Sequence, residues 1–96
     1  MHSKNQKEIV FSSHSLARMF ERGIPFEYVR QTIKTGNIIE KYPDDRPYPS
    51  VLLVCNIEGV YLHVVKAESE EADIVITAYY PDPELWDVHC DRRKKE

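Results

Sequence analysis

Three β-prone runs in the second half of the chain constrain its fold most strongly. Residues 51–57, 60–67 and 74–80 are rich in Val, Ile and Tyr, and they are separated by the turn signal Glu58-Gly59 and by an acidic loop over residues 68–73. Runs of this length, divided by short polar connections, are typical of an antiparallel meander. The chain is therefore predicted to build its core on an antiparallel sheet.

The first half of the chain predicts a short, well-delimited helix over residues 14–23. At about 100° per residue its apolar side chains gather on one side, and His14, Arg18 and Arg22 form a row on the other. Two serines directly before this stretch can cap its start, and Gly23 can end it in the left-handed conformation. One face is predicted to pack on the core and the other to be free for chemistry.

A second helix is predicted between Pro25 and Gly36, because proline suits the first turn of a helix and apolar residues recur at spacings of three and four. Short β-prone runs precede and follow the pair, at residues 8–11 and 37–40. The predicted fold class is α+β. It has a short N-terminal strand, a two-helix hairpin, then an antiparallel sheet of three to four strands with both helices on one sheet face.

The alternation of side chains along a strand assigns residues to the two sheet faces. The set expected to face the helices is Val60, Leu62, Val64, Ile74, Ile76 and Ala78. The set expected on the other face is Tyr61, His63, Val65, Val75, Thr77 and Tyr79. We therefore expect a polar and aromatic floor on an open sheet face.

Size and charge limit the possible functions. Ninety-six residues form one domain, which we place at residues 1–90, followed by a basic tail at 91–96 that is predicted to be disordered. The net charge of −3 argues against a broad basic surface for nucleic acid, so any anion site must be local. No apolar stretch is long enough for a signal peptide or a membrane helix, and we expect a cytoplasmic protein.

Aromatic residues and cysteines outside the regular elements give further expectations. Trp86 is predicted to fold back as an anchor on the core. In the proline-rich loop at 42–50, Arg46 and Tyr48 either line a binding surface or cover the edge of the core. Cys55 is predicted to be buried and Cys90 to be a surface thiol, with a disulfide between them possible but not required.

Four segments together resemble the DUF4258 family of small bacterial and archaeal proteins of unknown function. They are Phe11-Ser-x-His14-x-x-x-Arg18-Met-x-Glu-Arg22-Gly-Ile, the loop at 42–50, Leu62-His63-Val-Val and Tyr80-Pro-Asp-Pro-x-x-Trp86. The element order is similar to that of the RelE, BrnT and MqsR toxins, which are small RNases of toxin–antitoxin systems. The resemblance implies a toxin-like protein that acts on messenger or ribosome-associated RNA. It also implies a small antitoxin-like partner, possibly with a zinc finger.

RNA cleavage without a metal needs a base for the 2′-hydroxyl proton, an acid for the leaving 5′-oxygen and cations on the phosphate. The hypothesis is that His63 and His14 share the acid–base work and that Arg18 and Arg22 hold the scissile phosphate. Tyr79 or Tyr48 would stack on a base or support the acid. The predicted catalytic set is His14, Arg18, Arg22, His63 and Tyr79. The predicted substrate-binding set is Arg46, Tyr48 and Tyr61. No cofactor is predicted for such a metal-independent endoribonuclease.

Two other functions remain open. In the first, the protein is a non-catalytic interaction module whose helix face and basic tail dock an acidic partner, while the sheet takes a peptide. In the second, His14, His63 and a carboxylate bind zinc, although no His-x-x-x-His or Cys-x-x-Cys spacing supports this site.

Overall fold

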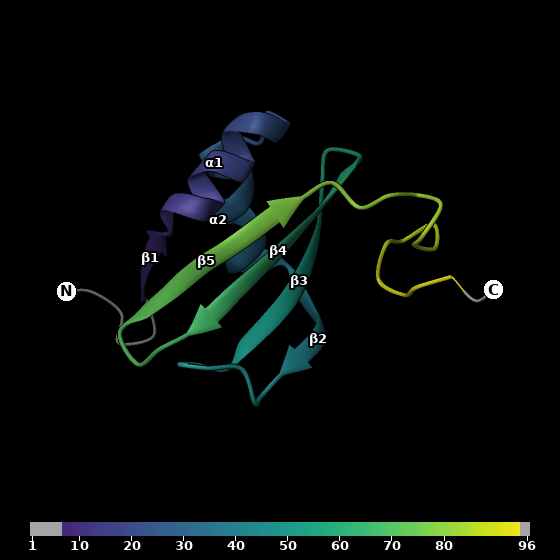
Figure 1. Cartoon of the computed structure of the whole chain (residues 1–96). Helices are drawn as coiled ribbons and strands as arrows, with labels where there is room; N and C mark the ends of the chain where they lie inside the picture. Colours follow the sequence, from purple (N-terminus) through teal and green to yellow (C-terminus); the bar gives the residue numbers. More distant parts are fainter. Residues whose placement is uncertain (1–6, 95–96) are drawn as a thin grey trace.

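A five-stranded sheet with two helices on one face forms the body of the protein (Figure 1). The computed structural model describes residues 7–94. The elements in chain order are β1 (Glu8–Phe11), α1 (Ser13–Arg22), α2 (Phe26–Thr35), β2 (Asn37–Tyr42), β3 (Ser50–Ile57), β4 (Val60–Glu68) and β5 (Ala72–Tyr79). The strand order is β1-β5-β4-β3-β2, in which the pairs β2–β3, β3–β4 and β4–β5 are antiparallel and the pair β1–β5 is parallel. The α+β prediction is confirmed, and the sheet is larger than predicted and mixed.

Both helices begin and end within one residue of the predicted bounds. The Ser12 hydroxyl accepts a hydrogen bond from the Ser15 N–H at 3.0 Å and donates one to the Val75 carbonyl at 3.0 Å, so it caps α1 and ties it to β5. Gly23 ends α1 at a φ of 64°. Gly36 ends α2 for another reason, since its φ is −74° but a Cβ there would lie 2.8 Å from the Val54 carbonyl oxygen. Glycine is required there because the helix end lies directly against β3.

The main core lies between the helices and the sheet. Leu62 and Val64 on β4 are fully buried in it, as the alternation predicts. The prediction for β5 is wrong in part, because Val75, and not Ile74 or Ile76, belongs to this core. A register shift between β4 and β5 causes the difference, since Val65 pairs with Thr77 while the next residue of β4 already pairs with Val75. Beyond this bulge the predicted alternation holds again at Ala78.

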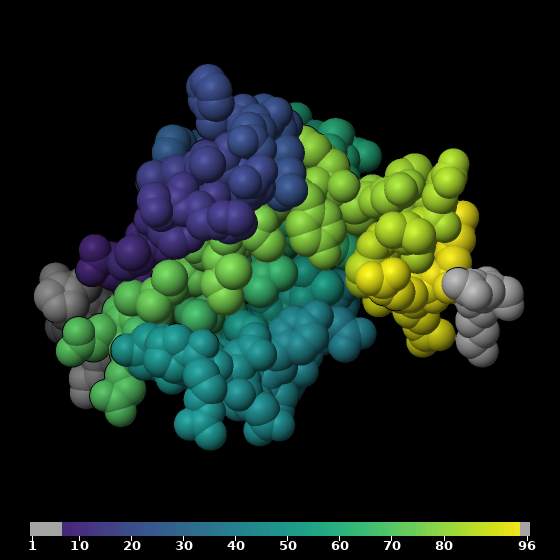
Figure 2. Space-filling model, viewed as in Figure 1, coloured from purple at the N-terminus to yellow at the C-terminus, as the bar shows by residue number. Residues whose placement is uncertain are grey.

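The C-terminal strap, residues 81–94, folds against the other face of the sheet and stands out as a lobe in Figure 2. Trp86, 6% exposed, packs with Cys90, Leu52 and Val54, so its prediction as an anchor is confirmed. Cys90 is buried, so its prediction as a surface thiol is wrong, and both cysteines are free. Two backbone hydrogen bonds stabilise the strap internally. The Asp87 N–H donates to the Arg92 carbonyl oxygen at 2.9 Å, and the Lys94 N–H donates to the Leu85 carbonyl oxygen at 3.0 Å.

Two further expectations concern the tail and the membrane. Residues 91–94 of the predicted disordered tail belong to the strap, whereas residues 95 and 96 lie outside the described part of the chain. Across residues 7–94, neither helix has the length and hydropathy that a membrane span requires.

Candidate functional site

His63 lies at the centre of the sheet face opposite the helices and is fully buried. It pairs across the sheet with Val54 on β3 and with Tyr79 on β5. The Trp86 ring stands edge-on to the imidazole, with ring centroids 4.5 Å apart and planes at 85°. The sheet face predicted to be open is therefore covered at this point by the strap.

The hydrogen bonds of His63 assign its tautomer. Its Nε2 lies 2.7 Å from the Cys90 carbonyl oxygen. A carbonyl oxygen can only accept, so Nε2 must carry the proton and donate it. Nδ1 of the neutral ring is then an acceptor, and the Tyr79 hydroxyl, 3.3 Å away, donates to it. The phenol proton of Tyr79 thus points at a buried base, and the hydroxyl lone pairs are left for another partner.

Burial lowers the pKa of His63 below its usual 6.5, and the hydrogen bond to the Cys90 carbonyl opposes that shift only in part. The neutral ring is therefore the form present in the folded protein at neutral pH. This state agrees with the tautomer that the hydrogen bonds assign.

The lowered pKa of His63 predicts a loss of stability in mild acid. The unfolded chain binds a proton near pH 6.5 while the folded chain does so only at lower pH, so stability is complete above about pH 6.5 and falls as the pH drops towards 5. The slope is at most about 1.4 kcal/mol per pH unit for one proton. Melting temperatures measured from pH 7.5 to 5 should show this decline in the wild type, and a flat profile in the wild type would contradict it. In a folded His63→Gln variant the decline should be absent.

Tyr79 contacts the buried histidine and is influenced by the charges of two arginines. Burial is the largest effect on its pKa and raises it, and Tyr42 adds to that increase. The charges of Arg93 and Arg22 act in the opposite direction, which places the phenol in the field of both guanidinium groups. The raised pKa keeps the hydroxyl protonated at neutral pH, and the two arginines weaken that increase through their positive charge.

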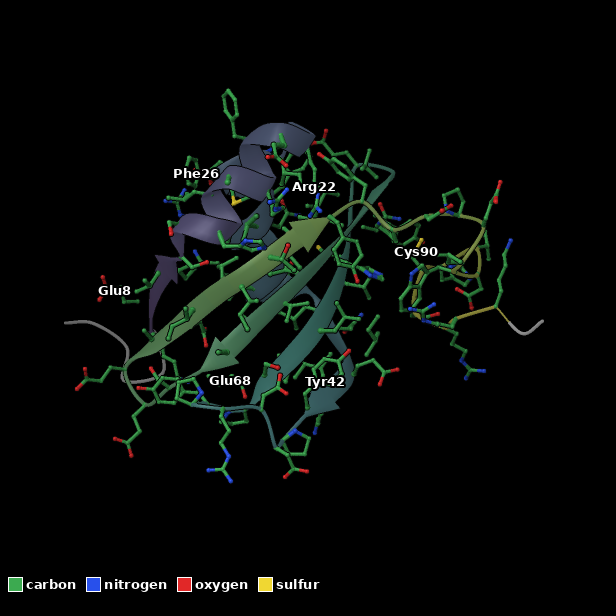
Figure 3. All side chains as sticks on the ribbon, viewed as in Figure 1. Glu8, Arg22, Phe26, Tyr42, Glu68 and Cys90 are labelled. Carbon is green, nitrogen blue, oxygen red and sulfur yellow. The ribbon has the colours of Figure 1, made fainter. Side chains whose placement is uncertain are left out.

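Each arginine is held by its own contacts. Arg22 Nη1 donates to the Ala78 carbonyl oxygen at 2.7 Å and to the Thr77 hydroxyl at 3.4 Å, so the end of α1 is fastened to the end of β5. The Arg93 guanidinium carbon lies 5.3 Å from the centroid of the Trp86 ring in the strap. We call the group His63, Thr77, Tyr79, Arg22 and Arg93 the Tyr79 cluster. Figure 3 labels Arg22, which lies close to the end of β5.

The other predicted catalytic residues lie apart from this cluster. His14 is exposed on α1, about two turns before Arg22, and no hydrogen bond or ion pair within residues 7–94 joins it to His63 or Tyr79. Arg18 forms an ion pair with Glu21 on the same helix. Of the predicted row on α1, Arg22 is therefore the residue whose hydrogen bonds reach β5.

The predicted substrate-binding residues are divided between two places. Arg46 is exposed in the connection from β2 to β3, and Tyr48 from the same loop lines a hollow with Ser69, Glu70 and Glu71. Acidic neighbours make that hollow unsuited to an RNA phosphate. Tyr61 is half-buried on the His63 face and lines a groove at the edge of the strap.

Sequence reasoning did not identify Arg93 as a site residue, because a basic tail gives no periodicity that would place it. The only available signal was Trp86 seven residues earlier, which predicts that part of the tail is drawn onto the sheet. Within residues 7–94, no group of three or more His, Cys, Asp or Glu side chains is positioned to hold a metal ion. Both ring nitrogens of His63 already have protein partners, which disfavours the zinc site considered from sequence.

Comparison with protein families matches residues 11–80 to the domain of unknown function DUF4258. No curated protein and no solved structure gives a significant match. The matched region includes both helices and the sheet strands β2 to β5, and it contains every predicted catalytic residue. The strap begins where the match ends. The chain thus belongs to the DUF4258 family of domains of unknown function.

Proposed function

We propose that this protein is a metal-independent endoribonuclease that cleaves RNA through attack of the 2′-oxygen, with the Tyr79 cluster as its site. One observation carries the proposal. The Tyr79 hydroxyl donates to a neutral buried histidine and lies in the field of Arg22 and Arg93. A proton acceptor beside two guanidinium groups is the combination that phosphodiester transesterification needs.

The proton path follows from the tautomer of His63. As the 2′-oxygen attacks phosphorus, its proton passes to the Tyr79 oxygen, and the phenol proton passes to Nδ1 of His63. The bond from phosphorus to the 5′-oxygen breaks, a solvent water protonates that leaving oxygen, and the hydroxide so formed takes the proton of His63 back through the Tyr79 hydroxyl. The products are a 2′,3′-cyclic phosphate and a 5′-hydroxyl. The Cys90 carbonyl, which accepts from Nε2 at 2.7 Å, stabilises the imidazolium formed in this step.

The arginines supply the charge stabilisation. Arginine has five N–H donors in a planar fork, and Arg22 directs one nitrogen to β5, which leaves donors for phosphate oxygens. Arg93 adds a second positive charge near the phenol. These charges are local, in agreement with a protein of net charge −3 that binds RNA at one place.

The biological setting belongs to the same proposal. The order of the elements is similar to that of RelE-like toxins, which supports a toxin-like role in the cytoplasm on messenger or ribosome-associated RNA. A small antitoxin-like protein would then restrain the enzyme.

The test is cleavage of a mixed RNA pool by the purified protein in EDTA. We expect cleavage that chelator does not reduce, with 2′,3′-cyclic phosphate ends. Arg22→Ala should lower the rate by about 10²–10³-fold, the loss typical of removing one transition-state donor. The matched control is Arg30→Ala on α2, where Arg30 pairs with Glu27 and should leave the rate unchanged. Wild-type protein that is inactive on both free and ribosome-bound RNA would contradict the proposal.

An interaction module is the second candidate, because one apolar surface is exposed on the helices. Phe20 is 89% exposed, and with Leu16 and Phe26 it borders a hollow on the outer side of α1 and α2. A large exposed aromatic residue of this kind is typical of a docking surface. An inactive wild type would make this surface the primary candidate for function.

A further inference from the structure

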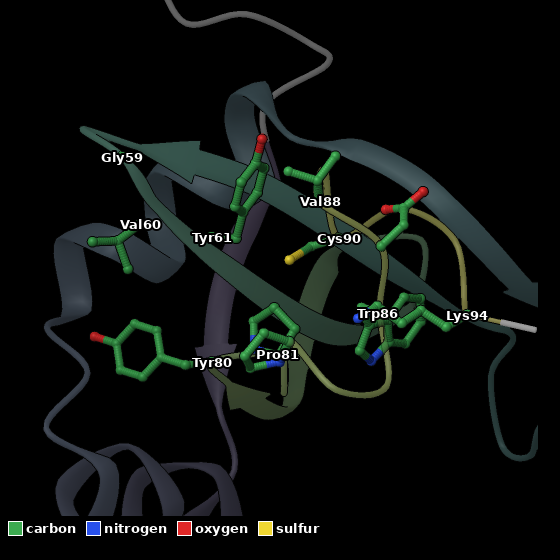
Figure 4. Close-up of a pocket in the computed structure, with 11 residues that line it drawn as sticks. Gly59, Val60, Tyr61, Tyr80, Pro81, Trp86, Val88, Cys90 and Lys94 are labelled. Atoms are coloured by element: carbon green, nitrogen blue, oxygen red, sulfur yellow. The ribbon is translucent and has the colours of Figure 1, made fainter.

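A groove runs between the strap and the β3–β4 turn (Figure 4), and Trp86 in its lining also contacts His63 of the Tyr79 cluster. Its volume is about 660 Å³, which lies within the range of small-ligand sites. Tyr61 and Tyr80 contribute aromatic rings, Pro81 and Trp86 contribute further apolar surface, and Lys94 stands at one end. The groove therefore combines planar apolar walls with a cation at its rim.

The accessible rings are those of the tyrosines. Tyr80 is 39% exposed and Tyr61 is half-buried. Trp86 itself is 6% exposed, and its ring is occupied by His63 on one side and by the Arg93 guanidinium. An incoming planar group would therefore stack on a tyrosine, while Trp86 forms the inner wall.

The groove lining carries one cation, Lys94, and one carboxylate, Asp87. The strap ends in Arg92, Arg93 and Lys94, whereas the whole chain is acidic. The one carboxylate of the groove lining, Asp87, accepts from the backbone N–H groups of His89 at 3.1 Å and Asp91 at 3.4 Å, and these bonds lower its pKa. That carboxylate stays ionised and balances the charge of Lys94, so the lining is close to neutral and suits an uncharged planar group at the rings with an anionic group beside Lys94.

We infer that this groove binds an unpaired nucleobase of the RNA, next to the bond that is cut. The inference rests on the proposed function and names the part of the substrate that positions it. Pro81 follows Tyr79 by two residues, which span at most about 7 Å of extended chain. Trp86 of the groove also contacts His63, so a base stacked here would hold the neighbouring phosphate near the end of β5, where Arg22 binds the Ala78 carbonyl and Tyr79 contacts His63. Stacking on an aromatic side chain recognises single-stranded RNA in this way.

The single tryptophan of the chain is Trp86, so its fluorescence reports directly on the groove. The experiment titrates the full-length Tyr79→Phe variant, which binds without cutting, with short single-stranded RNA oligonucleotides. An abasic oligonucleotide of the same length and charge is titrated in parallel. We expect the base-containing RNA to quench Trp86 fluorescence and to bind at least about tenfold more tightly than the abasic one, the gain expected from stacking one base.

Two pairs of substitutions locate the binding. Tyr80→Ala should weaken binding about tenfold, whereas Tyr80→Phe keeps the ring and should bind normally. Lys94→Gln should weaken binding and its dependence on salt, whereas Lys41→Gln on β2 should change neither. These comparisons hold length, fold and overall charge nearly constant.

Several outcomes overturn the inference. They are equal affinity for abasic and base-containing RNA, or quenching by a proline-rich peptide with none by RNA. If the wild type cleaves RNA and Tyr80→Ala does not change the rate, the role of the groove in RNA binding is contradicted, whereas the endoribonuclease activity is supported. Base-dependent quenching together with an inactive wild type would contradict the proposed endoribonuclease activity but support the nucleobase site.

Discussion

Replacing Tyr79 by Phe is expected to lower the rate of RNA cleavage by about 10²–10⁴-fold, the range in which positioned proton transfer contributes to catalysis. The substitution removes only the hydroxyl that links the attacking 2′-oxygen to His63. The rate should be measured under single-turnover conditions, so that chemistry and not product release is observed.

The Tyr79→Phe variant should remain folded. Its ring keeps the edge-on contact with His63, whose centroid lies 5.2 Å away. The loss of one hydrogen bond costs about 1 kcal/mol, so the melting temperature should fall by only a few degrees. Tyr28→Phe on α2 is the matched control, because it removes the same atom from a tyrosine on the helix side of the sheet. Full activity in the Tyr79→Phe variant would exclude Tyr79 from the chemistry.

Replacing His63 by Ala is expected to destabilise the fold by about 2–4 kcal/mol, as truncation of a large buried side chain does. In a domain of this size that loss corresponds to roughly 10–20 °C in melting temperature. The ring is fully buried, and its removal leaves a void beneath Trp86 and deprives the Cys90 carbonyl of its donor. Thermal unfolding followed by circular dichroism measures the effect.

The control for this prediction comes from the strap itself. His89 is exposed, and its contact within the strap is made by the backbone N–H rather than by the ring. His89→Ala should therefore change stability by less than about 0.5 kcal/mol. An unchanged melting temperature in His63→Ala would show that the strap does not depend on the imidazole. Because His63→Ala alters stability, activity comparisons with it require matched folded fractions, and Tyr79→Phe is the cleaner test of catalysis.

Local signals in the sequence predicted the parts of the fold that local chemistry determines. A capping serine and a left-handed glycine bounded α1, and period-two alternation placed Leu62 and His63 on opposite sheet faces. The alternation failed at Ile76 because a bulge adds one residue to a strand without leaving a mark in the pattern. The parallel pairing of β1 could not be predicted either, because it depends on a partner far away in the chain.

The site was also predicted only in part, because local patterns place residues within the sheet but not those that come from distant segments. His63 and Tyr79 were expected on one face of adjacent strands, and the structure pairs them directly. The cover over them was not predicted, since the strap is an irregular segment whose path depends on where Trp86 finds a cavity. Arg93 reaches the site only because that cover exists. Sequence patterns therefore gave the neighbours within the sheet but not the residues brought from outside it.

The parallel pairing of β1 with β5 also sets the order in which the molecule can assemble. The β3–β4 hairpin closes through the two-residue turn Glu58-Gly59, whose φ angles are both positive, and this step is local and fast. β1 is synthesised first but must wait for residues 72–75, and loop closure over that distance is slow. The strap is synthesised after all five strands. A nascent chain that has made every sheet strand thus still has His63 open to water, and the Tyr79 cluster is completed only when the strap has been synthesised.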